Sequence, residues 1–371
     1  MLASASRPVA LRPGPAAGVL GRDLLRRPEA TRRSLHLGVL VTDPADRPGR
    51  GHRLVAGLRL GLEHARDLHA SVTAAGATPF GPALVDAATR LLEAGADALV
   101  VTSAGVADLL GPLCSSRGIG LVVADEGDLV AHPAQHRRGV LRRTEHHWQE
   151  AYVLGQWAAQ HLQGSLFQLV SRDEGSGDGV VALRAGYVEH GESVAGSVEV
   201  WPRSATAAAQ VARVSGARVV AVHATGHQLR EIVEALRAAR VPAEIVIAGR
   251  GVDERDLADL GRGGAVYAAS TWHRADVPDL VLALQRGTGA RPDATTALGY
   301  DIASRLVQAC RDEALADLTS PDPADEDCSL VVRRAASGKV SVVARRPLPV
   351  AAPDLDAVAV GPAITALPHH G

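Results

Sequence analysis

The sequence predicts an α/β protein made of two doubly wound parallel-sheet lobes, and three observations support this prediction. Short apolar strands alternate with amphipathic helices from Leu35 onward, and this order is typical of parallel sheets. The same series occurs twice, before and after a helix expected at Glu145–Gln163. The chain of 371 residues is also long enough for two such units.

The first series is organised around two continuous apolar runs, Ala98–Val101 and Leu121–Ala124, joined by a short helix. Such runs are typical of parallel strands that are covered on both faces. The carboxyl ends of these strands are where open α/β sheets bind ligands. The earlier strands are expected at His36–Thr42 and Ser71–Ala74, and the earlier helices at His52–Asp67 and from Gly81 onward.

The second series follows the same order and ends in a hairpin. Its expected strands are Ser165–Ser171, Val194–Val200, Ala217–His223, Ala243–Ala248 and Ala265–Thr271, and its helices are Gly179–His190, Ala205–Val214 and His227–Arg240. Two further helices are expected around Val277–Gln285 and Thr295–Arg311, before a hairpin of Leu330–Arg334 and Lys339–Arg346.

Composition excludes several classes of partner. With 22% charged residues and a net charge of −2, the chain has no electrostatic reason to bind nucleic acid or a membrane surface. No apolar run approaches the length of a transmembrane helix, so we expect no membrane insertion. The three cysteines fit no metal-ligand spacing, and we expect neither a metal nor a cofactor. A disulfide between Cys310 and Cys328 stays open if the chain is exported.

The N-terminal residues 1–33 are rich in Arg, Pro, Ala and Gly and predict a disordered arm. Arg32-Arg33 superficially resembles a twin-arginine export motif, but the apolar segment behind it, Leu37–Val41, is better used as the first core strand. No uninterrupted apolar segment of signal-peptide type follows the basic residues. These features leave the cellular location open.

Several segments, in order, resemble the type I periplasmic binding protein family. The resemblance is strongest to the branched-chain amino-acid, leucine-binding-protein-like substrate-binding components of ABC transporters. It rests on Gly57–Ala65, which looks like the family's first helix, on the strand segment Gly95–Val101, and on Ala297–Asp301. The resemblance covers the chain from Leu35 to Cys310 and implies two lobes, a hinge of three crossings and a ligand cleft between the lobes.

The resemblance also implies how the chain divides into lobes. The crossings are expected near Gly139–Thr144, near Gly264–Thr271 and after Pro321. Lobe 1 would then comprise residues 34–140 and 265–320, and lobe 2 residues 141–264 and 328–350. Residues 351–371 are expected to form a loose tail.

In lobe 1 the resemblance points to two ligand-binding turns. Ser103, with Ala104 and Gly105, looks like the family's serine turn that binds an amino-acid carboxylate. The family's small-residue and threonine turn after the next strand is replaced by the acidic residues Asp125, Glu126 and Asp128. These carboxylates are candidates for holding an ammonium group.

In lobe 2 three family positions differ in chemistry. Two cleft tyrosines correspond to about Ser176 and Thr225, and the acidic residue that pairs with the ligand ammonium corresponds to about Arg250. An arginine would repel an ammonium and offer a two-pronged contact to a carboxylate or phosphate. Three interpretations stay open for Arg250: a ligand contact, an ion pair with the acidic turn of lobe 1, or a solvated charge.

The resemblance implies a solute-binding protein for an ABC importer, which captures a small polar or acidic metabolite by lobe closure. The ligand would be an amino acid, a carboxylate or an amide, and the partner an ABC permease. Two alternatives stay open: a cytoplasmic ligand sensor that signals to a regulatory partner protein, and a degenerate interaction module. No enzyme is expected, because Ser115, His132 and Asp125 lack the nucleophile-elbow context of a hydrolase triad.

Overall fold

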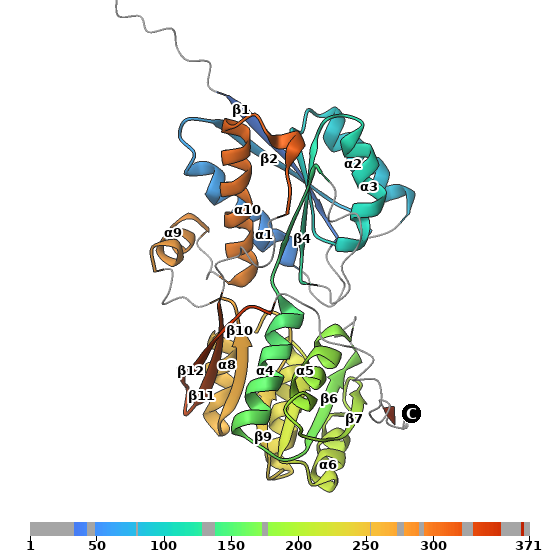
Figure 1. Ribbon diagram of the computed structural model, residues 1–371, viewed down its shortest axis with the longest axis vertical. Coiled ribbons are helices and arrows are strands. Elements are labelled where there is room, and N and C mark those ends of the chain that lie inside the picture. Colours follow the sequence, from blue (N-terminus) through green and yellow to red (C-terminus); the bar gives the residue numbers. More distant parts are fainter. Residues whose placement is uncertain are drawn as a thin grey trace, which may run out of the picture.

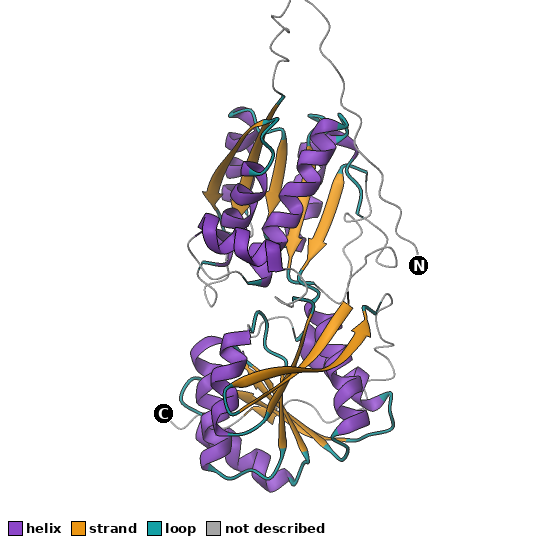
Figure 2. Ribbon diagram, turned by 90° about the vertical axis from the view of Figure 1, so that its left-hand side faces the viewer, coloured by secondary structure: helices purple, strands orange, loops and turns teal. Residues whose placement is uncertain are grey.

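The chain folds into two α/β lobes that lie one above the other in Figure 1. Each lobe has a central sheet with helices on both faces, as the turned view in Figure 2 shows. The computed structural model describes residues 33–42, 49–78, 81–127, 138–172, 177–252, 254–272, 278–288, 293–320, 329–349 and 365–366. The predicted two-lobed α/β fold is confirmed.

Lobe 1 contains a five-stranded parallel sheet in the order β2-β1-β3-β4-β5. Helices α1 and α10 cover one face and α2 and α3 the other, on the two sides of the upper sheet in Figure 1. Helix α9 (Pro278–Thr288) packs against α1. The strands are β1 (Ser34–Val41), β2 (His69–Gly76), β3 (Ala98–Val101), β4 (Gly120–Asp125) and β5 (Val140–Thr144), and the covering helices are α1 (Arg50–Glu63), α2 (Pro82–Glu93), α3 (Ala107–Ser115) and α10 (Ala294–Arg311).

Lobe 2 contains an eight-stranded sheet in the order β12-β11-β10-β9-β8-β6-β7-β13, in which β11 and β12 are antiparallel. Helices α4 and α5 pack on one face, and α6, α7 and α8 on the other. The strands are β6 (Leu166–Ser171), β7 (Val194–Val200), β8 (Val219–His223), β9 (Glu244–Ile247), β10 (Val266–Ser270), β11 (Ser329–Ala336), β12 (Lys339–Pro347) and β13 (Thr365–Ala366). The helices are α4 (His147–His161), α5 (Asp178–Val188), α6 (Ala205–Ser215), α7 (Gly226–Ala238) and α8 (Glu254–Leu260).

The inner strands are mainly apolar because both of their faces are covered. Every residue of β3, β4, β6 and β8 is buried. A half-exposed strand would alternate apolar and polar residues, and β2, at the edge of its sheet, has only partly buried or exposed residues. The carboxyl ends of the inner strands of both sheets open toward the space between the lobes.

One helix pair in each lobe packs at backbone contact through glycine. In lobe 1, a Cβ atom at Gly57 of α1 would lie 2.0 Å from the carbonyl oxygen of Thr296 in α10. In lobe 2, a Cβ atom at Gly155 of α4 would lie 2.1 Å from the carbonyl oxygen of Leu183 in α5. Because no side chain larger than hydrogen fits at these positions, each lobe has one interhelical contact that leaves little freedom for sliding.

Two expected lobe boundaries, at residues 140/141 and 264/265, fall at the start of a strand and not at its end, although the crossings lie in the expected segments. Pairing partners far apart in sequence decide to which sheet each of these strands belongs. Most of the segment Gly139–Thr144, where the first crossing was expected, forms β5, which pairs with β4 and extends the lobe 1 sheet. The strand after residue 265 does not belong to lobe 1, since β10 pairs with β9 and β11 in the lobe 2 sheet. The second crossing therefore leaves lobe 2 after Ser270, and the third, expected after Pro321, lies outside the described residues.

The chain ends also differ in part from expectation. Residues 1–32 lie outside the described residues, but Arg33 forms an ion pair with Glu313 (2.6 Å) at the far end of α10. Within the expected loose tail, Thr365–Ala366 pairs with β7 at the sheet edge. Cys310 is a free, buried thiol, and Cys328, the other half of the possible pair, lies outside the described residues.

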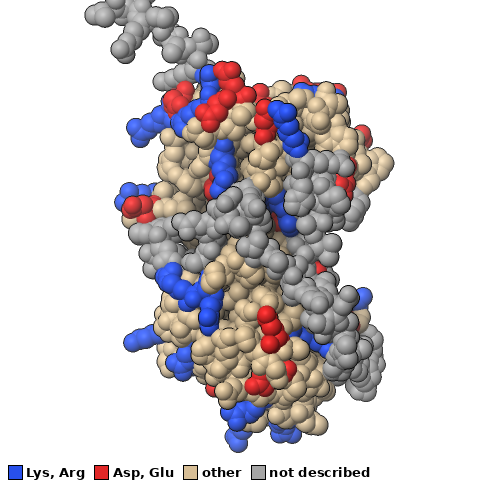
Figure 3. Space-filling view, in the orientation of Figure 1, with Lys and Arg blue, Asp and Glu red and all other residues tan. Residues whose placement is uncertain are grey.

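Acidic and basic side chains are interspersed on the face shown in Figure 3, in keeping with the small net charge. Within the described part of the chain, none of the helices combines the length and the apolar character needed to cross a bilayer.

We predict that Gly57→Ala destabilises the protein by about 1–3 kcal/mol, because the new methyl group must push apart two helix backbones. Gly111→Ala in α3 is the matched control, since a Cβ atom there would meet no atom within 4 Å. Alanine has the higher helix propensity, so the control should be neutral or stabilised by up to about 1 kcal/mol. Urea denaturation followed by circular dichroism would measure both, and equal effects at the two positions would contradict the packing argument.

Candidate functional site

A polar cavity of about 280 Å³ lies between the two lobes. Lobe 1 contributes the N-terminal turn of α1 and the end of β4, and lobe 2 contributes the turns after β8 and β9 and the end of β10. The starts of α4 and α10, next to the crossings between the lobes, complete the wall. The cavity is therefore built from strand ends and helix starts, the usual location of ligand sites in open α/β sheets.

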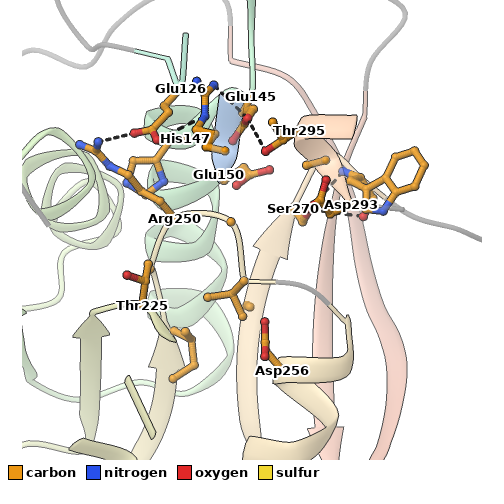
Figure 4. Close-up of a pocket in the computed structure, with 18 of the residues that line it drawn as sticks. Glu126, Glu145, His147, Glu150, Thr225, Arg250, Asp256, Ser270, Asp293 and Thr295 are labelled. Carbon is orange, nitrogen blue, oxygen red and sulfur yellow. Dashed lines mark hydrogen bonds and ion pairs between the residues drawn. The ribbon is translucent and has the colours of Figure 1, made fainter. Parts of the chain in front are cut away.

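A chain of ion pairs crosses the cavity from lobe 2 to lobe 1 (Figure 4). Arg250, after β9, donates from Nη1 to Oε2 of Glu126 (2.5 Å), which follows β4. The other oxygen of Glu126 lies 3.5 Å from Nε of Arg50, and Nη2 of Arg50 lies 3.0 Å from Oε1 of Glu145. Thr295 Oγ1 donates to the same oxygen of Glu145 (2.9 Å). Four charged side chains thus join the lobes across the cleft.

Arg50 is the buried centre of this chain, with only 3% of its surface exposed. Its Nη1 also lies 3.5 Å from the carbonyl oxygens of Thr102 and Ala124, at the ends of β3 and β4. Burial lowers the pKa of Arg50, but attraction from Glu145 and Glu126 outweighs burial and leaves the pKa raised. The guanidinium therefore stays charged, and it holds two carboxylates at the cavity wall.

The two described acids of the turn after β4, Asp125 and Glu126, have different surroundings. Asp125 is 3% exposed and forms a two-pronged pair with Arg142 of β5, at 2.8 Å and 3.3 Å, while it also accepts a hydrogen bond from the Gly127 amide. It is not among the described residues that line the cavity, and its partners are structural. Glu126 faces the cavity instead. Asp128 lies outside the described residues.

Of the other residues predicted to bind a ligand, only some lie in the wall of this cavity. Thr225 and Arg250 line the cavity together with Glu126. Ser103, Ala104 and Gly105 follow β3 as expected, but they are not among the described residues of the cavity wall, and Ser176 lies outside the described residues. The ion-pair interpretation of Arg250 matches this structure. The ligand roles of all these residues stay predictions.

The walls of lobe 2 depend on a close approach between two strand ends. A Cβ atom at Gly249, after β9, would lie 1.8 Å from the carbonyl oxygen of Ala224, after β8. Glycine at this position therefore lets the turn that carries Arg250 lie directly against the turn that carries Thr225. Thr225 precedes α7, so the start of that helix also faces the cavity.

Glu150, on the first turns of α4, is a cavity residue held by the second crossing. Its Oε1 accepts hydrogen bonds from the backbone amide (2.7 Å) and hydroxyl (3.1 Å) of Thr271, just after β10. Burial raises the pKa of this carboxyl to about 8, and the two hydrogen bonds from Thr271 offset only part of that effect. At neutral pH the protonated, uncharged form of Glu150 is therefore favoured.

Sequence analysis missed Arg50, Glu145, Glu150 and Thr295, although weak signals for them were present. Arg50 begins the helix after the first strand, so it lies at the same sheet edge as Glu126. Glu145 and Glu150 flank the start of α4, which directly follows the first crossing. For the three charged residues, the signal in the sequence was a charged side chain near the start of a helix that follows a strand or a crossing.

Metal-binding geometry is not found in the described part of the chain, where no group of three or more His, Cys, Asp or Glu side chains is arranged to hold an ion. His223, at the end of β8, is fully enclosed, and burial lowers its pKa to about 3. It lies 3.1 Å from Gln168 Nε2, an arrangement in which the neutral imidazole accepts the hydrogen bond.

Two α/β lobes joined by chain crossings, with a polar cavity between their strand ends, define a bilobal binding protein. The chain belongs to the periplasmic binding protein family, whose model, described as "Periplasmic binding protein", matches residues 82–325. This match confirms the family resemblance inferred from the sequence. Members of this family serve as the substrate-binding proteins of ABC transporters and in general are not enzymes. No curated protein sequence matches the chain.

Solved structures support the same fold. A substrate-binding protein of an ABC transporter from Sphaerobacter thermophilus is 14% identical, with a TM-score of 0.70 over 86% of this chain and all of that chain (100%). A solute-binding protein from R. palustris in complex with benzoate is 14% identical, with a TM-score of 0.65 over 86% of this chain and 98% of that chain. A leucine-binding protein from Thermotoga maritima is 15% identical, with a TM-score of 0.63 over 84% and 98%.

We predict that Arg250 and Glu126 are energetically coupled by about 1–3 kcal/mol, because both side chains are largely buried (16% and 14% exposed). A double-mutant cycle with Arg250→Gln and Glu126→Gln, followed by urea denaturation, measures this coupling. Arg230 and Asp256 form the matched control, since that pair is 55% and 42% exposed and should couple by less than about 1 kcal/mol. Additive effects of Arg250→Gln and Glu126→Gln would contradict the interlobe pair.

We predict that Glu150→Gln stabilises the protein at alkaline pH. The pKa of Glu150 is raised from 4.5 to about 8 by folding, so the folded state binds the extra proton and wild-type stability falls as pH rises between these values. Glutamine keeps the uncharged shape, and its advantage at pH 9 should exceed about 1 kcal/mol. Thermal unfolding from pH 5 to pH 9 measures this difference.

Glu189→Gln is the control of opposite sign. Hydrogen bonds from Tyr152 and Gln156 lower the pKa of Glu189, so its ionised form stabilises the folded state above the pKa of the unfolded chain. Glu189→Gln should therefore be neutral or destabilising at pH 9. A Glu150→Gln variant whose stability runs parallel to wild type across the pH range would contradict the assignment of a raised pKa.

Proposed function

We propose that this protein captures a small polar solute for an ABC importer by closing its two lobes over the ligand. The observation that supports the proposal is the cavity itself, whose polar wall combines Glu126 from lobe 1 with Thr225 and Arg250 from lobe 2. A ligand that contacts both walls binds the closed arrangement better than the open one and shifts the population toward closure.

The ion pair between Arg250 and Glu126 stabilises the closed arrangement of the lobes. The two residues come from different lobes, so their 2.5 Å contact requires the lobes to be close together. An acidic ligand that reaches Arg250 must compete with Glu126 for the guanidinium. A polar ligand that leaves the pair intact benefits from it, because the same contact favours the closed lobes. The ion-pair chain therefore disfavours acidic solutes relative to other polar ones.

We predict that a bound solute raises the melting temperature and reduces the radius of gyration. At one hundred times its dissociation constant, a ligand that binds only the folded state adds about 2.7 kcal/mol of stability. A thermal-shift screen of amino acids, amines, carboxylates and amides, followed by small-angle X-ray scattering of each hit, would test both effects. A complete absence of thermal shifts across this library would overturn the proposed function.

A cavity-filling variant provides the matched control. Thr225→Phe places a bulky ring in the cavity wall and should abolish the shift given by any hit. Val214→Phe adds the same ring at a position that is 82% exposed, away from the cavity, and should leave the shift unchanged. Equal responses of the two variants would place the binding site elsewhere.

A further inference from the structure

Acidic side chains outnumber arginines in the wall of the cavity. Among the described residues of its wall, five are acidic and three are arginines. Each arginine forms an ion pair with a carboxylate: Arg250 with Glu126, Arg50 with Glu126 and Glu145, and Arg53 with Asp293 (2.7 Å). The arginine charge of the wall is thus already matched by the protein, and Asp256 pairs with Arg230 outside the wall (3.2 Å). Glu150 is the remaining acid.

Glu150 is the cavity acid without a basic partner. Within the described part of the chain no arginine, lysine or histidine forms an ion pair with it, and its hydrogen bonds come from Thr271. Both of those bonds are made to Oε1, so Thr271 of the second crossing fixes the carboxyl group, while among the described residues no hydrogen bond reaches Oε2. The carboxyl is therefore oriented at the cavity wall with a remaining oxygen for a further contact.

Neighbouring charges act on Glu150 in opposite directions. Glu145, on the first crossing just before α4, raises its pKa by repulsion, and Arg333 on β11 lowers it by attraction. Arg333 is itself engaged, because it lies 3.5 Å from Glu254 and donates to the carbonyl oxygen of Trp272. The wall also presents His147, Arg50 and Asp293, of which the last two are ion-paired. Burial remains the largest influence and leaves the carboxyl uncharged at neutral pH.

We propose that Glu150 receives a protonated amino group of the ligand, so that the solute captured in this cleft is an organic cation. This inference rests on the proposed function. The ligand ammonium lies against the carboxyl group that Thr271 holds, and it pairs with the carboxylate that Glu150 forms when it releases its proton. Burial in the cavity makes such a charge-assisted hydrogen bond stronger than a neutral one.

Ligand binding changes the protonation of Glu150, and the proton that Glu150 loses is accounted for. Before binding, Glu150 is a carboxylic acid and the amine is an ammonium ion in water. In the complex, the carboxylate accepts hydrogen bonds from the ammonium group, and the proton of Glu150 passes to solvent. Binding below about pH 8 therefore releases up to one proton, and binding at pH 9 releases almost none because Glu150 is already ionised.

The rest of the wall fits the carbon chain of such a ligand. Ile247, Val252, Ala268 and Ala269 give the cavity an apolar side at the ends of β9 and β10. A volume of about 280 Å³ is just below the range for drug-sized small-molecule sites, roughly 300 to 1,000 Å³. We therefore expect a short aliphatic cation instead of a large or aromatic one.

Isothermal titration calorimetry with putrescine and agmatine tests the proposal, with butyramide and succinate as uncharged and anionic counterparts. At pH 7 the two cations should bind, and titrations in buffers of different ionisation enthalpy should report the release of about half to one proton. At pH 9 this release should fall toward zero. Butyramide and succinate should bind at least about tenfold more weakly.

Glu150→Gln should weaken putrescine binding about tenfold or more and abolish the proton release, because the amide cannot ionise. Glu189→Gln, at the end of α5 and not among the described residues of the cavity wall, should retain both. The inference is overturned if neither cation binds, if succinate binds more tightly than putrescine, or if Glu150→Gln binds putrescine with wild-type affinity and proton release. Any of these results, together with another solute that shifts the melting temperature, leaves the proposed function standing. A library without any hit overturns the proposed function itself.

Discussion

The burial of the Arg50 guanidinium is the constraint on which the cleft depends. A buried cation is costly unless opposite charges and hydrogen-bond acceptors surround it, and here Glu126, Glu145 and two carbonyl oxygens do so. These partners come from the ends of β3 and β4 and from the crossing into lobe 2. One side chain therefore ties the ligand edge of the lobe 1 sheet to the start of the hinge.

The other contacts of the cleft extend from this centre. Glu126 reaches Arg250 in lobe 2, and Glu145 accepts a hydrogen bond from Thr295 at the start of α10. Glu145 lies on the first crossing and pairs with Arg50 of the cavity wall. Thr271 lies on the second crossing and donates to Glu150 of α4, which also lines the cavity. The hinge and the binding surface thus share residues, since Glu145 and Thr271 lie on crossings and contact residues of the cavity wall.

Local patterns in the sequence were enough to predict the fold and part of the site. Ala98–Val101 was located at its observed bounds because a strand covered on both faces is apolar throughout. Glu126 was a candidate because it follows a strand at the ligand edge of a sheet, and Thr225 and Arg250 were candidates by the family resemblance; all three line the cavity.

The errors arose where long-range pairing decides the outcome. Nothing near Val140 or Val266 in the sequence says which neighbouring strand each will join, so both lobe boundaries were misplaced. The importance of Arg50 and Glu150 likewise depends on partners about 95 and 121 residues away along the chain.

The packing of α1 against α10 also has a consequence for the synthesis of the protein. Helix α1 ends at Glu63, but the helix that completes its layer ends at Arg311, after the chain has built most of lobe 2. At a synthesis rate of roughly 5 to 20 residues per second, the intervening segment takes on the order of 10 to 50 s to emerge. For that time the apolar face of the nascent lobe 1 sheet stays partly uncovered, so this lobe reaches its native state late, although its strands are made first.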